Sequence, residues 1–184
     1  MDLFRVFDWD STSTGRRPGG PLHVARERQG AGRHDSPGLY GAWYCSGHAV
    51  SAVAESIQYF RGQALAGEDF LRVGGSRKAL VALRIEPGVD LVDLDDPSVL
   101  VRRRLRPSQV ATLRRTTTQR IAADIFEGGA VGLLWWSTLD AEWTNITLFH
   151  ERALPRVSIV SPPRALSTSM PDVQEAAAHL GIRV

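Results

Sequence analysis

The segment from Gly32 to Glu55 constrains the fold most, because it changes character twice within 24 residues. It starts as a polar turn that contains Arg33 and is interrupted by glycine and proline, and it continues as a short aromatic run over residues 39–45. A helical pattern that carries Glu55 follows from about His48. We therefore predict a loop, a strand and a helix in succession. Loops carry reactive groups whose position is fixed by the scaffold behind them, so Arg33 and Glu55 can share one cleft.

The helix predicted from about Ala49 to Arg61 has an apolar stripe on one side, formed by Val50, Val53, Ala54, Ile57 and Phe60. With a rotation of about 100° per residue, Glu55 falls on nearly the opposite side. Two readings are open for this carboxylate. It faces solvent, as a helical glutamate usually does, or it faces a cavity lined by other parts of the chain.

The rest of the chain mixes strands and helices without the strict strand–helix–strand order of a parallel sheet. Strands are predicted at residues 3–9, 78–86, 89–94, 130–136, 144–149 and 157–160, helices at residues 116–127 and 171–180, and loops at residues 10–20 and 62–76. The charged segment 23–34 is expected to be exposed. No internal repeat or domain boundary is visible, and 184 residues suit one domain. The predicted fold class is α+β, a single compact domain over residues 1–184 with a mixed or antiparallel sheet core and flanking helices.

The composition is that of a soluble globular protein, with 43% apolar and 23% charged residues. Cys45 is the single cysteine, so an intrachain disulfide is impossible, and we expect burial as a small apolar side chain. The chain starts without a basic region that leads into an apolar stretch, and no run approaches the roughly 20 apolar residues of a spanning helix. The prediction is a cytoplasmic protein without membrane contact.

Metal and cofactor motifs are missing from the sequence. The five histidines are scattered, and none has the spacing to a cysteine or to another histidine that metal sites show. A phosphate-binding Gly-x-x-x-x-Gly-Lys loop is absent, and so is the Gly-x-Gly-x-x-Gly fingerprint of dinucleotide-binding domains. We therefore predict neither a metal nor a resident cofactor.

Taken in order, several motifs of the chain resemble the RES family of bacterial toxins, which is named for its Arg, Glu and Ser. The first part of the match is Gly32-Arg33-His34-Asp35, Pro37-Gly38, Trp43-Tyr44-Cys45-Ser46 and Ala52-Val53-Ala54-Glu55. Downstream, a glycine-led strand that ends in serine is similar to residues 131–137, and an asparagine followed by an apolar strand is similar to residues 145–149. With Phe4-Arg5-Val6 as the first strand, the resemblance extends from about residue 3 to residue 160, and residues 161–184 form a C-terminal extension.

Two residue pairs depart from the family pattern. His34-Asp35 stands where an aromatic residue and Asn are usual, and Trp135-Trp136 stands where Tyr-Pro is common. The first pair belongs to the loop that holds Arg33 and could alter the fit of a substrate. The second pair could reshape a pocket wall while leaving Ser137 in place.

The resemblance implies a fold similar to that of ADP-ribosyltransferases and cleavage of the nicotinamide–ribose bond of NAD⁺, in a glycohydrolase- or phosphorylase-type reaction. NAD⁺ would be a substrate and not a resident cofactor, and loss of cellular NAD⁺ would be the toxic outcome. The resemblance also implies a partner, a small helix-turn-helix antitoxin of the Xre type.

In such a reaction, charged residues have the clearest roles. Nicotinamide leaves as a neutral molecule while positive charge builds on the ribose, so Glu55 would stabilise that charge, hold the ribose hydroxyls or orient a water. Arg33 suits the pyrophosphate or a ribose oxygen, because a guanidinium offers a planar fork of donors. Arg5, a charge at the start of an apolar strand, is a second candidate for this contact.

Three further residues complete the set of candidates. Ser137 is expected to hydrogen-bond the nicotinamide amide or the ribose, and it is not a nucleophile because no histidine is placed by sequence to activate it. Tyr44 would stack on nicotinamide or line the cleft, and Asn145 would brace the site. Without the resemblance, Ser137 is more simply a turn residue and Tyr44 a core residue.

Two alternative functions stay open at this point. Transfer of ADP-ribose to a protein acceptor would use the same residues, because water and an acceptor compete for one reactive centre. A basic nucleic-acid-binding or interaction module is favoured by the cluster Arg102, Arg103, Arg104 and Arg106. It is opposed by a formal net charge of only +2 and by aromatic residues that sit in apolar runs. Direct contact with nucleic acid is therefore not expected.

Overall fold

The alternating sequence at the N-terminus forms one of two long paired strands. A computed structural model describes residues 1–72 and 74–184; Val73, in the predicted loop 62–76, lies outside the described residues. Strand β1 (Asp2–Trp9) pairs antiparallel with β3 (Arg77–Ile85), from Asp2 opposite Arg84 to Trp9 opposite Arg77. Successive side chains of a strand point to opposite faces, so Leu3 and Phe7, which are buried, share a face of β1 with Arg5.

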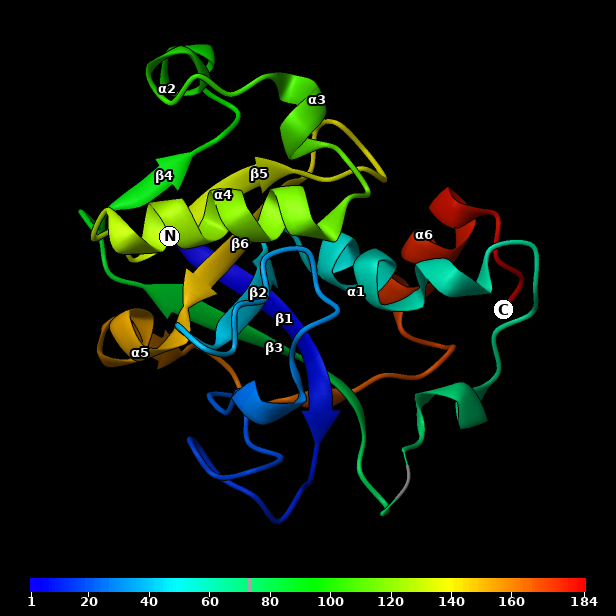
Figure 1. Ribbon diagram of the computed structural model, residues 1–184. Helices are drawn as coiled ribbons and strands as arrows, with labels where there is room; N and C mark the ends of the chain where they lie inside the picture. Colours follow the sequence, from blue (N-terminus) through cyan, green and yellow to red (C-terminus); the bar gives the residue numbers. More distant parts are fainter. Residues whose placement is uncertain (73) are drawn as a thin grey trace. The chain divides into compact units, whose positions relative to one another are not determined.

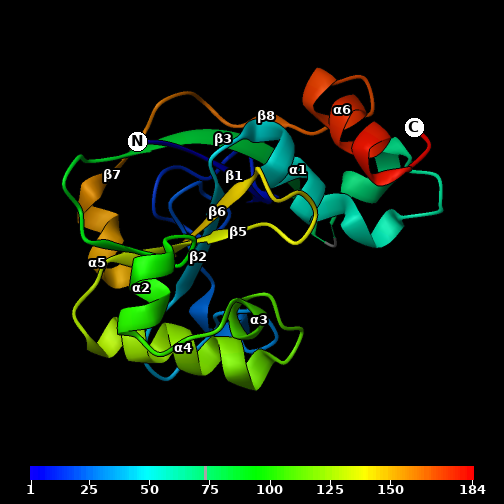
Figure 2. The same ribbon diagram turned by 90° about the horizontal axis from the view of Figure 1, so that it is seen from above.

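The chain forms two compact units, and strand β2 (Ala42–Ser46) contributes residues to both. The first unit comprises Met1–His23, Cys45–Arg84 and Ser158–Val184. Its strands follow the order β2-β1-β3-β7, and β8 also pairs with β3. Helices α1 and α6 pack side by side in both ribbon views (Figure 1, Figure 2). The remaining elements of this unit are α1 (Ala49–Ile57), η2 (Gln58–Phe60), η3 (Gly67–Phe70), β7 (Val157–Ile159, whose first residue belongs to the second unit), β8 (Arg164–Ala165) and α6 (Pro171–Leu180).

The second unit comprises Val24–Tyr44 and Ile85–Val157. Its strands follow the order β4-β5-β6-β2, with β4 parallel to β5 and β5 antiparallel to β6. Helix α4 lies against β5 (Figure 1). The elements of this unit are η1 (Arg26–Arg28), β4 (Leu91–Asp93), α2 (Pro97–Arg102), α3 (Pro107–Val110), α4 (Arg115–Glu127), β5 (Gly132–Trp136), β6 (Thr144–Phe149), α5 (His150–Ala153) and η4 (Leu154–Arg156).

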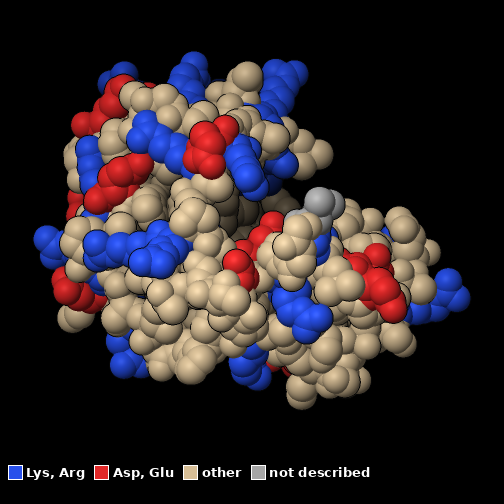
Figure 3. Space-filling view, turned by 90° about the horizontal axis from the view of Figure 1, so that it is seen from below, with Lys and Arg blue, Asp and Glu red and all other residues tan. Residues whose placement is uncertain are grey.

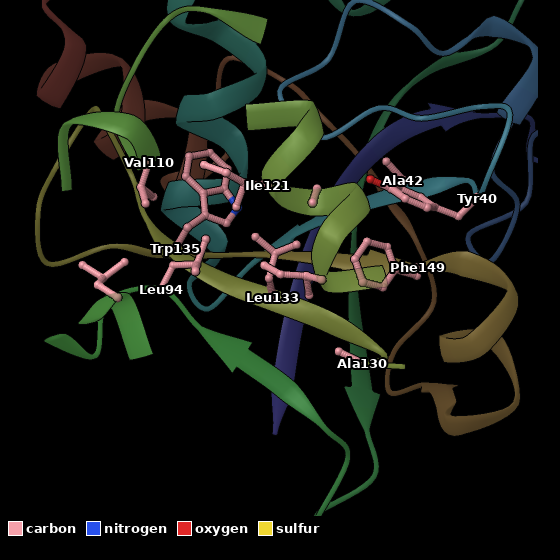
Figure 4. Packing of buried hydrophobic residues seen from close by; sticks show 12 residues of the cluster. Tyr40, Ala42, Leu94, Val110, Ile121, Ala130, Leu133, Trp135 and Phe149 are labelled. Atoms are coloured by element: carbon pink, nitrogen blue, oxygen red, sulfur yellow. The ribbon is translucent and has the colours of Figure 1, made fainter. Parts of the chain in front are cut away.

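The core of the second unit gathers apolar side chains from three helices and the sheet (Figure 4). Ile121, Ala122 and Ile125 repeat at helical spacing on α4 and pack in one cluster with Leu133 of β5. Leu100 of α2, Val110 of α3, Leu94, Trp135 and Phe149 belong to the same cluster. Each of the short helices α2 and α3 is therefore attached to the core of this unit by only one or two apolar residues.

Parallel and antiparallel strand pairs with helices beside them confirm the predicted α+β class with a mixed sheet. The limits of a single domain over residues 1–184 stay a prediction. The predicted strand 144–149 and helix 171–180 have the predicted bounds, and the helix predicted at 116–127 starts one residue earlier. Within the described residues, no helix is both long and apolar enough to cross a membrane.

Two expectations are wrong. The segment 23–34 was expected to be exposed, but Arg33 and His34 at its end are buried because α4 and β6 supply hydrogen-bond partners for them. On α1, Val50 is only half-buried, whereas Ser51 and Ala52 are buried outside the predicted stripe. Helix α1 packs against both β1 and α6, so more than one of its sides is covered.

The end of α2 holds the one described non-glycine residue with a positive φ, Arg104 at 54°. Two hydrogen bonds close the helix around it, from the Arg104 N–H to the Val101 carbonyl at 3.0 Å and from the Leu105 N–H to the Leu100 carbonyl at 2.9 Å. This is the Schellman pattern, in which glycine is the preferred residue at the left-handed position. An arginine there is strained, because its Cβ crowds the backbone in this conformation.

We therefore expect Arg104→Gly to raise the free energy of unfolding by about 1 kcal/mol, because glycine adopts a positive φ without this strain. Urea denaturation of the two proteins measures the change. Arg103→Gly is the matched control, since it removes the same charge one residue earlier, where φ is −88°. This control should lower the free energy of unfolding by about 0.5 kcal/mol. Equal shifts in the two variants would show that charge, and not backbone conformation, sets the effect.

Candidate active site

The turn that carries Arg33 is closed by the carboxylate of Asp35. Its Oδ2 accepts hydrogen bonds from the backbone N–H of Gly30 at 2.8 Å and of Gly32 at 2.7 Å, and its Oδ1 accepts one from the Tyr44 hydroxyl at 2.7 Å. Asp35 is only 6% exposed. Hydrogen bonds to an ionised acceptor are the strong kind, so these three bonds fix residues 30–35 as one rigid turn.

Two tyrosines hold the same turn from the side of β2. The Tyr44 hydroxyl accepts a hydrogen bond from the His34 N–H at 2.8 Å, and the Tyr40 hydroxyl donates one to the His34 carbonyl at 2.7 Å. Burial raises the pKa of both phenols above the ordinary value, and the neighbouring Asp35 raises it further. Both hydroxyls therefore keep their protons at neutral pH and can donate as these bonds require.

Arg33 itself is buried, with 8% of its surface exposed. Its Nη1 donates to the carbonyl of Val110 at 3.0 Å and to the carbonyl of Thr112 at 2.9 Å. Its guanidinium carbon lies 4.9 Å from the centre of the Trp135 ring, within cation–π distance. The Thr118 hydroxyl donates to the Arg33 carbonyl at 2.5 Å. The backbone and the side chain of Arg33 are therefore both held in place.

The two departures from the family pattern touch each other. The His34 ring meets Trp135 edge to face, with the ring centres 5.2 Å apart, and both side chains reach the hydroxyl of Thr147. Trp135 Nε1 donates to this oxygen at 3.3 Å, so the hydroxyl proton can be given to His34 Nδ1 at 2.8 Å. The ring proton of His34 is then on Nε2. Trp135 at this position thus supports the Arg33 turn.

His34 is held neutral by this environment. Burial, followed by the nearby charges of Arg33 and Arg115, lowers its pKa from 6.5 to about 3. A neutral imidazole suits the hydrogen bond that Nδ1 accepts from Thr147. It also avoids a second positive charge directly beside Arg33.

Ser137 and Asn145 lie at the β5–β6 pair. Ser137 follows β5, is 2% exposed, and its Oγ accepts a hydrogen bond from the Leu139 N–H at 3.1 Å. Its own N–H donates to the Trp143 carbonyl at 2.7 Å. Asn145 is also 2% exposed and stands opposite Trp135 in the strand register. Ser137 thus has a turn-forming contact, and the ligand contacts expected of both residues stay predictions.

Arg5 and Glu55 belong to the first unit. The Arg5 guanidinium donates to the carbonyls of Pro21 at 2.7 Å and His23 at 2.8 Å, and burial lowers its pKa to about 10. Arg5 is therefore tied to the loop that follows β1. Glu55 on α1 is half-buried, and its Oε2 accepts a hydrogen bond from Gln58 Nε2 at 2.9 Å. A glutamate that simply faces solvent does not fit this burial.

Cys45 has the expected environment. It is 5% exposed, and burial raises the pKa of its thiol to about 12. The side chain is therefore a neutral, small apolar group at neutral pH, as predicted.

A pocket of about 350 Å³ lies within the first unit, lined by Trp9, by residues of the loop after β1 that include Pro21, and by residues 159–163. None of the six candidate residues lines it. Arg5 contacts its wall through the Pro21 carbonyl.

Four of the six candidates thus belong to the second unit, where Arg33 and Tyr44 are joined through the turn, and Asn145 pairs with Trp135. That Arg5 and Glu55 act on the same ligand as Arg33 stays a prediction. Sequence reasoning singled out Asp35 and Trp135 but did not predict that they hold the turn, and it did not name Thr118 or Thr147. Asp35 had a general signal in the sequence, because aspartate in a glycine- and proline-rich turn often hydrogen-bonds nearby backbone N–H groups.

We expect Gly32→Ala to lower the free energy of unfolding by about 1–3 kcal/mol, the usual cost of overpacking. A Cβ at Gly32 would lie 2.5 Å from Asp35 Oδ1 and 2.6 Å from the Tyr44 hydroxyl oxygen, so the turn must shift. Gly38→Ala in the same loop is the control, because no described atom outside residues 37–39 lies within 4 Å of its added Cβ. Thermal unfolding compares them, and an equally small effect of both substitutions would contradict the rigid turn.

The low pKa of His34 predicts a pH dependence of stability. In the unfolded chain His34 takes up a proton near pH 6.5, whereas in the folded protein it does so only at about pH 3. The contribution of neutral His34 to the free energy of unfolding is therefore complete above pH 6.5 and is lost as the pH falls. Between pH 6.5 and pH 4 the loss should be about 3 kcal/mol. His34→Phe removes this titration, so its unfolding free energy should fall less steeply over this range in chemical denaturation. Parallel curves for the two proteins would rule the assignment out.

The sequence model of the RES domain family matches residues 3–169 of the chain. Among solved structures, a crystal structure of the M. tuberculosis MbcT–MbcA toxin–antitoxin complex matches with a TM-score of 0.69 and 15% identity, over 96% of this chain and 88% of that chain. At this identity the likeness shows the fold alone. No curated protein matches the chain by sequence. Because the family match covers most of the chain, from the first strand to beyond β8, this protein belongs to the RES domain family.

Proposed function

We propose that this protein cleaves the nicotinamide–ribose bond of NAD⁺ and is the toxin of a toxin–antitoxin pair. The observation that carries the proposal is the RES family match over residues 3–169, because this range contains all six candidate residues, from Arg5 to Asn145. The similar solved structure is that of a toxin–antitoxin complex, which is in keeping with the proposal.

The environment of Arg33 suits an anionic substrate. In the second unit, the carbonyls of Val110 and Thr112 and the ring of Trp135, all neutral groups, orient its guanidinium. Because the guanidinium is already oriented, little reorganisation of the protein is needed when a phosphate binds. Arg33 is therefore our candidate for the pyrophosphate of NAD⁺.

The environment of Glu55 suits the ribose. Half-burial weakens solvent screening of the carboxylate, and Gln58 orients one of its oxygens. As the bond to nicotinamide breaks, its electron pair goes to the pyridinium nitrogen, so nicotinamide leaves as a neutral molecule and the ribose becomes oxocarbenium-like. Glu55 would stabilise this cation and orient the water or phosphate that adds to it.

A neutralising protein is the proposed partner. The family resemblance implies a small helix-turn-helix antitoxin of the Xre type, and the similar structure is a complex of a toxin with its antitoxin. Such a partner would act by covering the residues that bind NAD⁺.

Glu55→Gln should reduce nicotinamide release from NAD⁺ by a factor on the order of 10² to 10³, the range found when one group that stabilises transition-state charge is removed. The substitution keeps the size of the side chain and a hydrogen-bond acceptor for Gln58. Glu175→Gln on the exposed part of α6 is the matched control and should release nicotinamide like the unchanged protein. Chromatography of free nicotinamide gives the rates.

The products of the same assay separate the possible reactions. Free ADP-ribose indicates hydrolysis, and a phosphorylated ADP-ribose formed only with inorganic phosphate indicates phosphorolysis. Label from NAD⁺ that stays on macromolecules of a cell extract would instead indicate ADP-ribosyl transfer. No nicotinamide release above that of Glu55→Gln in any of these conditions would reject the proposed function.

A further inference from the structure

Positive charge is concentrated on one segment of the second unit. Residues 97–120 contain seven arginines and neither lysine nor any acidic residue. The rest of the chain then has 15 basic and 20 acidic side chains, a formal net charge of −5, although the whole chain has +2. Figure 3 shows one face of the molecule, on which blue basic and red acidic side chains are interspersed. The seven residues are Arg102, Arg103, Arg104, Arg106, Arg114, Arg115 and Arg120.

All seven arginines are exposed, and none takes part in an ion pair within the described part of the chain. Elsewhere arginines do find acidic partners, as Arg84 does with Asp2 at 2.6 Å. Helices α2, α3 and α4 attach to the core through Leu100, Val110 and Ile121 (Figure 4). Three of the exposed arginines lie in helices, Arg102 in α2 and Arg115 and Arg120 in α4. The other four follow α2 or precede α3 and α4.

Several of these arginines are unfavourable for the isolated fold. Arg104 stands in the left-handed conformation that prefers glycine. Arg114 and Arg115 stand at the N-cap and first position of α4, where the helix dipole favours negative charge, and the first turn of α4 has no acidic residue. Strained or repelling positions that persist in a folded protein point to a function for the residues that occupy them.

Two apolar side chains accompany the arginines. Val101 is 76% exposed and Leu113 is 79% exposed, more than any other large apolar residue of the described chain. Protein interfaces combine such apolar contacts with arginine, which is enriched there relative to lysine. A surface for single-stranded nucleic acid would offer aromatic rings for base stacking, and residues 97–120 contain none. The combination therefore favours a protein over a nucleic acid.

We propose that residues 101–106 and 113–115, which we call the arginine surface, dock an acidic protein surface with apolar side chains among its carboxylates. The carboxylates would pair with the arginines, and the apolar side chains would cover Val101 and Leu113. This inference does not depend on NAD⁺ cleavage. The arginine surface nevertheless adjoins the candidate active site along the chain, because Leu113 follows Thr112, whose carbonyl accepts a hydrogen bond from Arg33.

The test uses the full-length protein and a labelled helical peptide of about five turns, with leucine along one face and glutamate elsewhere. Fluorescence anisotropy should show binding that weakens as salt is added. The triple variant Arg103→Gln/Arg104→Gly/Arg106→Gln should bind about tenfold more weakly. The control Arg16→Gln/Arg17→Gln/Arg61→Gln removes three exposed arginines of the first unit and should bind like the unchanged protein.

Two further measurements keep the test decisive. The single variant Arg104→Gly should bind more weakly although its fold is expected to be more stable, so unfolding cannot explain the loss. A peptide with serine in place of leucine should bind more weakly than the original, because Val101 and Leu113 then lose their contacts.

Four outcomes would overturn the proposal. They are the absence of peptide binding, equal losses in the triple variant and its control, equal binding of the serine and leucine peptides, and tighter binding of mixed-sequence duplex DNA than of the peptide. The last result would identify the arginine surface as a nucleic-acid site.

Discussion

The carboxylate of Asp35 is the interaction on which the candidate active site depends. A buried carboxylate is costly unless every lone pair that faces protein is hydrogen-bonded, and Asp35 satisfies this condition with the N–H groups of Gly30 and Gly32 and the hydroxyl of Tyr44. The condition also fixes the neighbours. Residue 32 has to lack a Cβ, because an added one would meet Asp35 Oδ1 at 2.5 Å. One negative charge thus dictates the residue types around Arg33.

The rigid turn lets Arg33 act as an oriented cation inside protein. Its carbonyl is held by Thr118 of α4, its guanidinium by the carbonyls of Val110 and Thr112, and its flat face by Trp135 of β5. Trp135 also packs on His34, so the imidazole and the guanidinium lie against the same ring. A charged imidazole would therefore repel the guanidinium at short range. Burial keeps His34 neutral, so one hydrophobic environment supports both the packing and the charge of the site.

Sequence patterns could predict what depends on neighbouring residues. The apolar repeats of α4 and α6 and the strand at 144–149 are local signals, and they give the correct elements. The burial of Arg33 could not be predicted in this way, because its partners Val110 and Thr118 lie 77 and 85 residues away in the sequence. A charged loop with glycines has the composition of an exposed segment until those partners are known. The short helices α2 and α3 were missed for a related reason, since each has one core residue and too few turns to show a period.

The segment that holds Arg33 is also the one that presents the arginine surface. The backbone carbonyls of Val110 and Thr112 face the guanidinium, whereas Leu113 and Arg114, the next two residues, are exposed. Helix α3 has only four residues, and it is held by Val110 in the core, by contacts with α4 and by the hydrogen bonds from Arg33. A protein that bound Leu113 would contact the residue directly after Thr112, whose carbonyl orients Arg33. If binding at either site shifts residues 110–113, a ligand of Arg33 changes the affinity of the arginine surface for its partner protein. Thermodynamic linkage then requires that the partner protein changes the affinity for that ligand by the same factor.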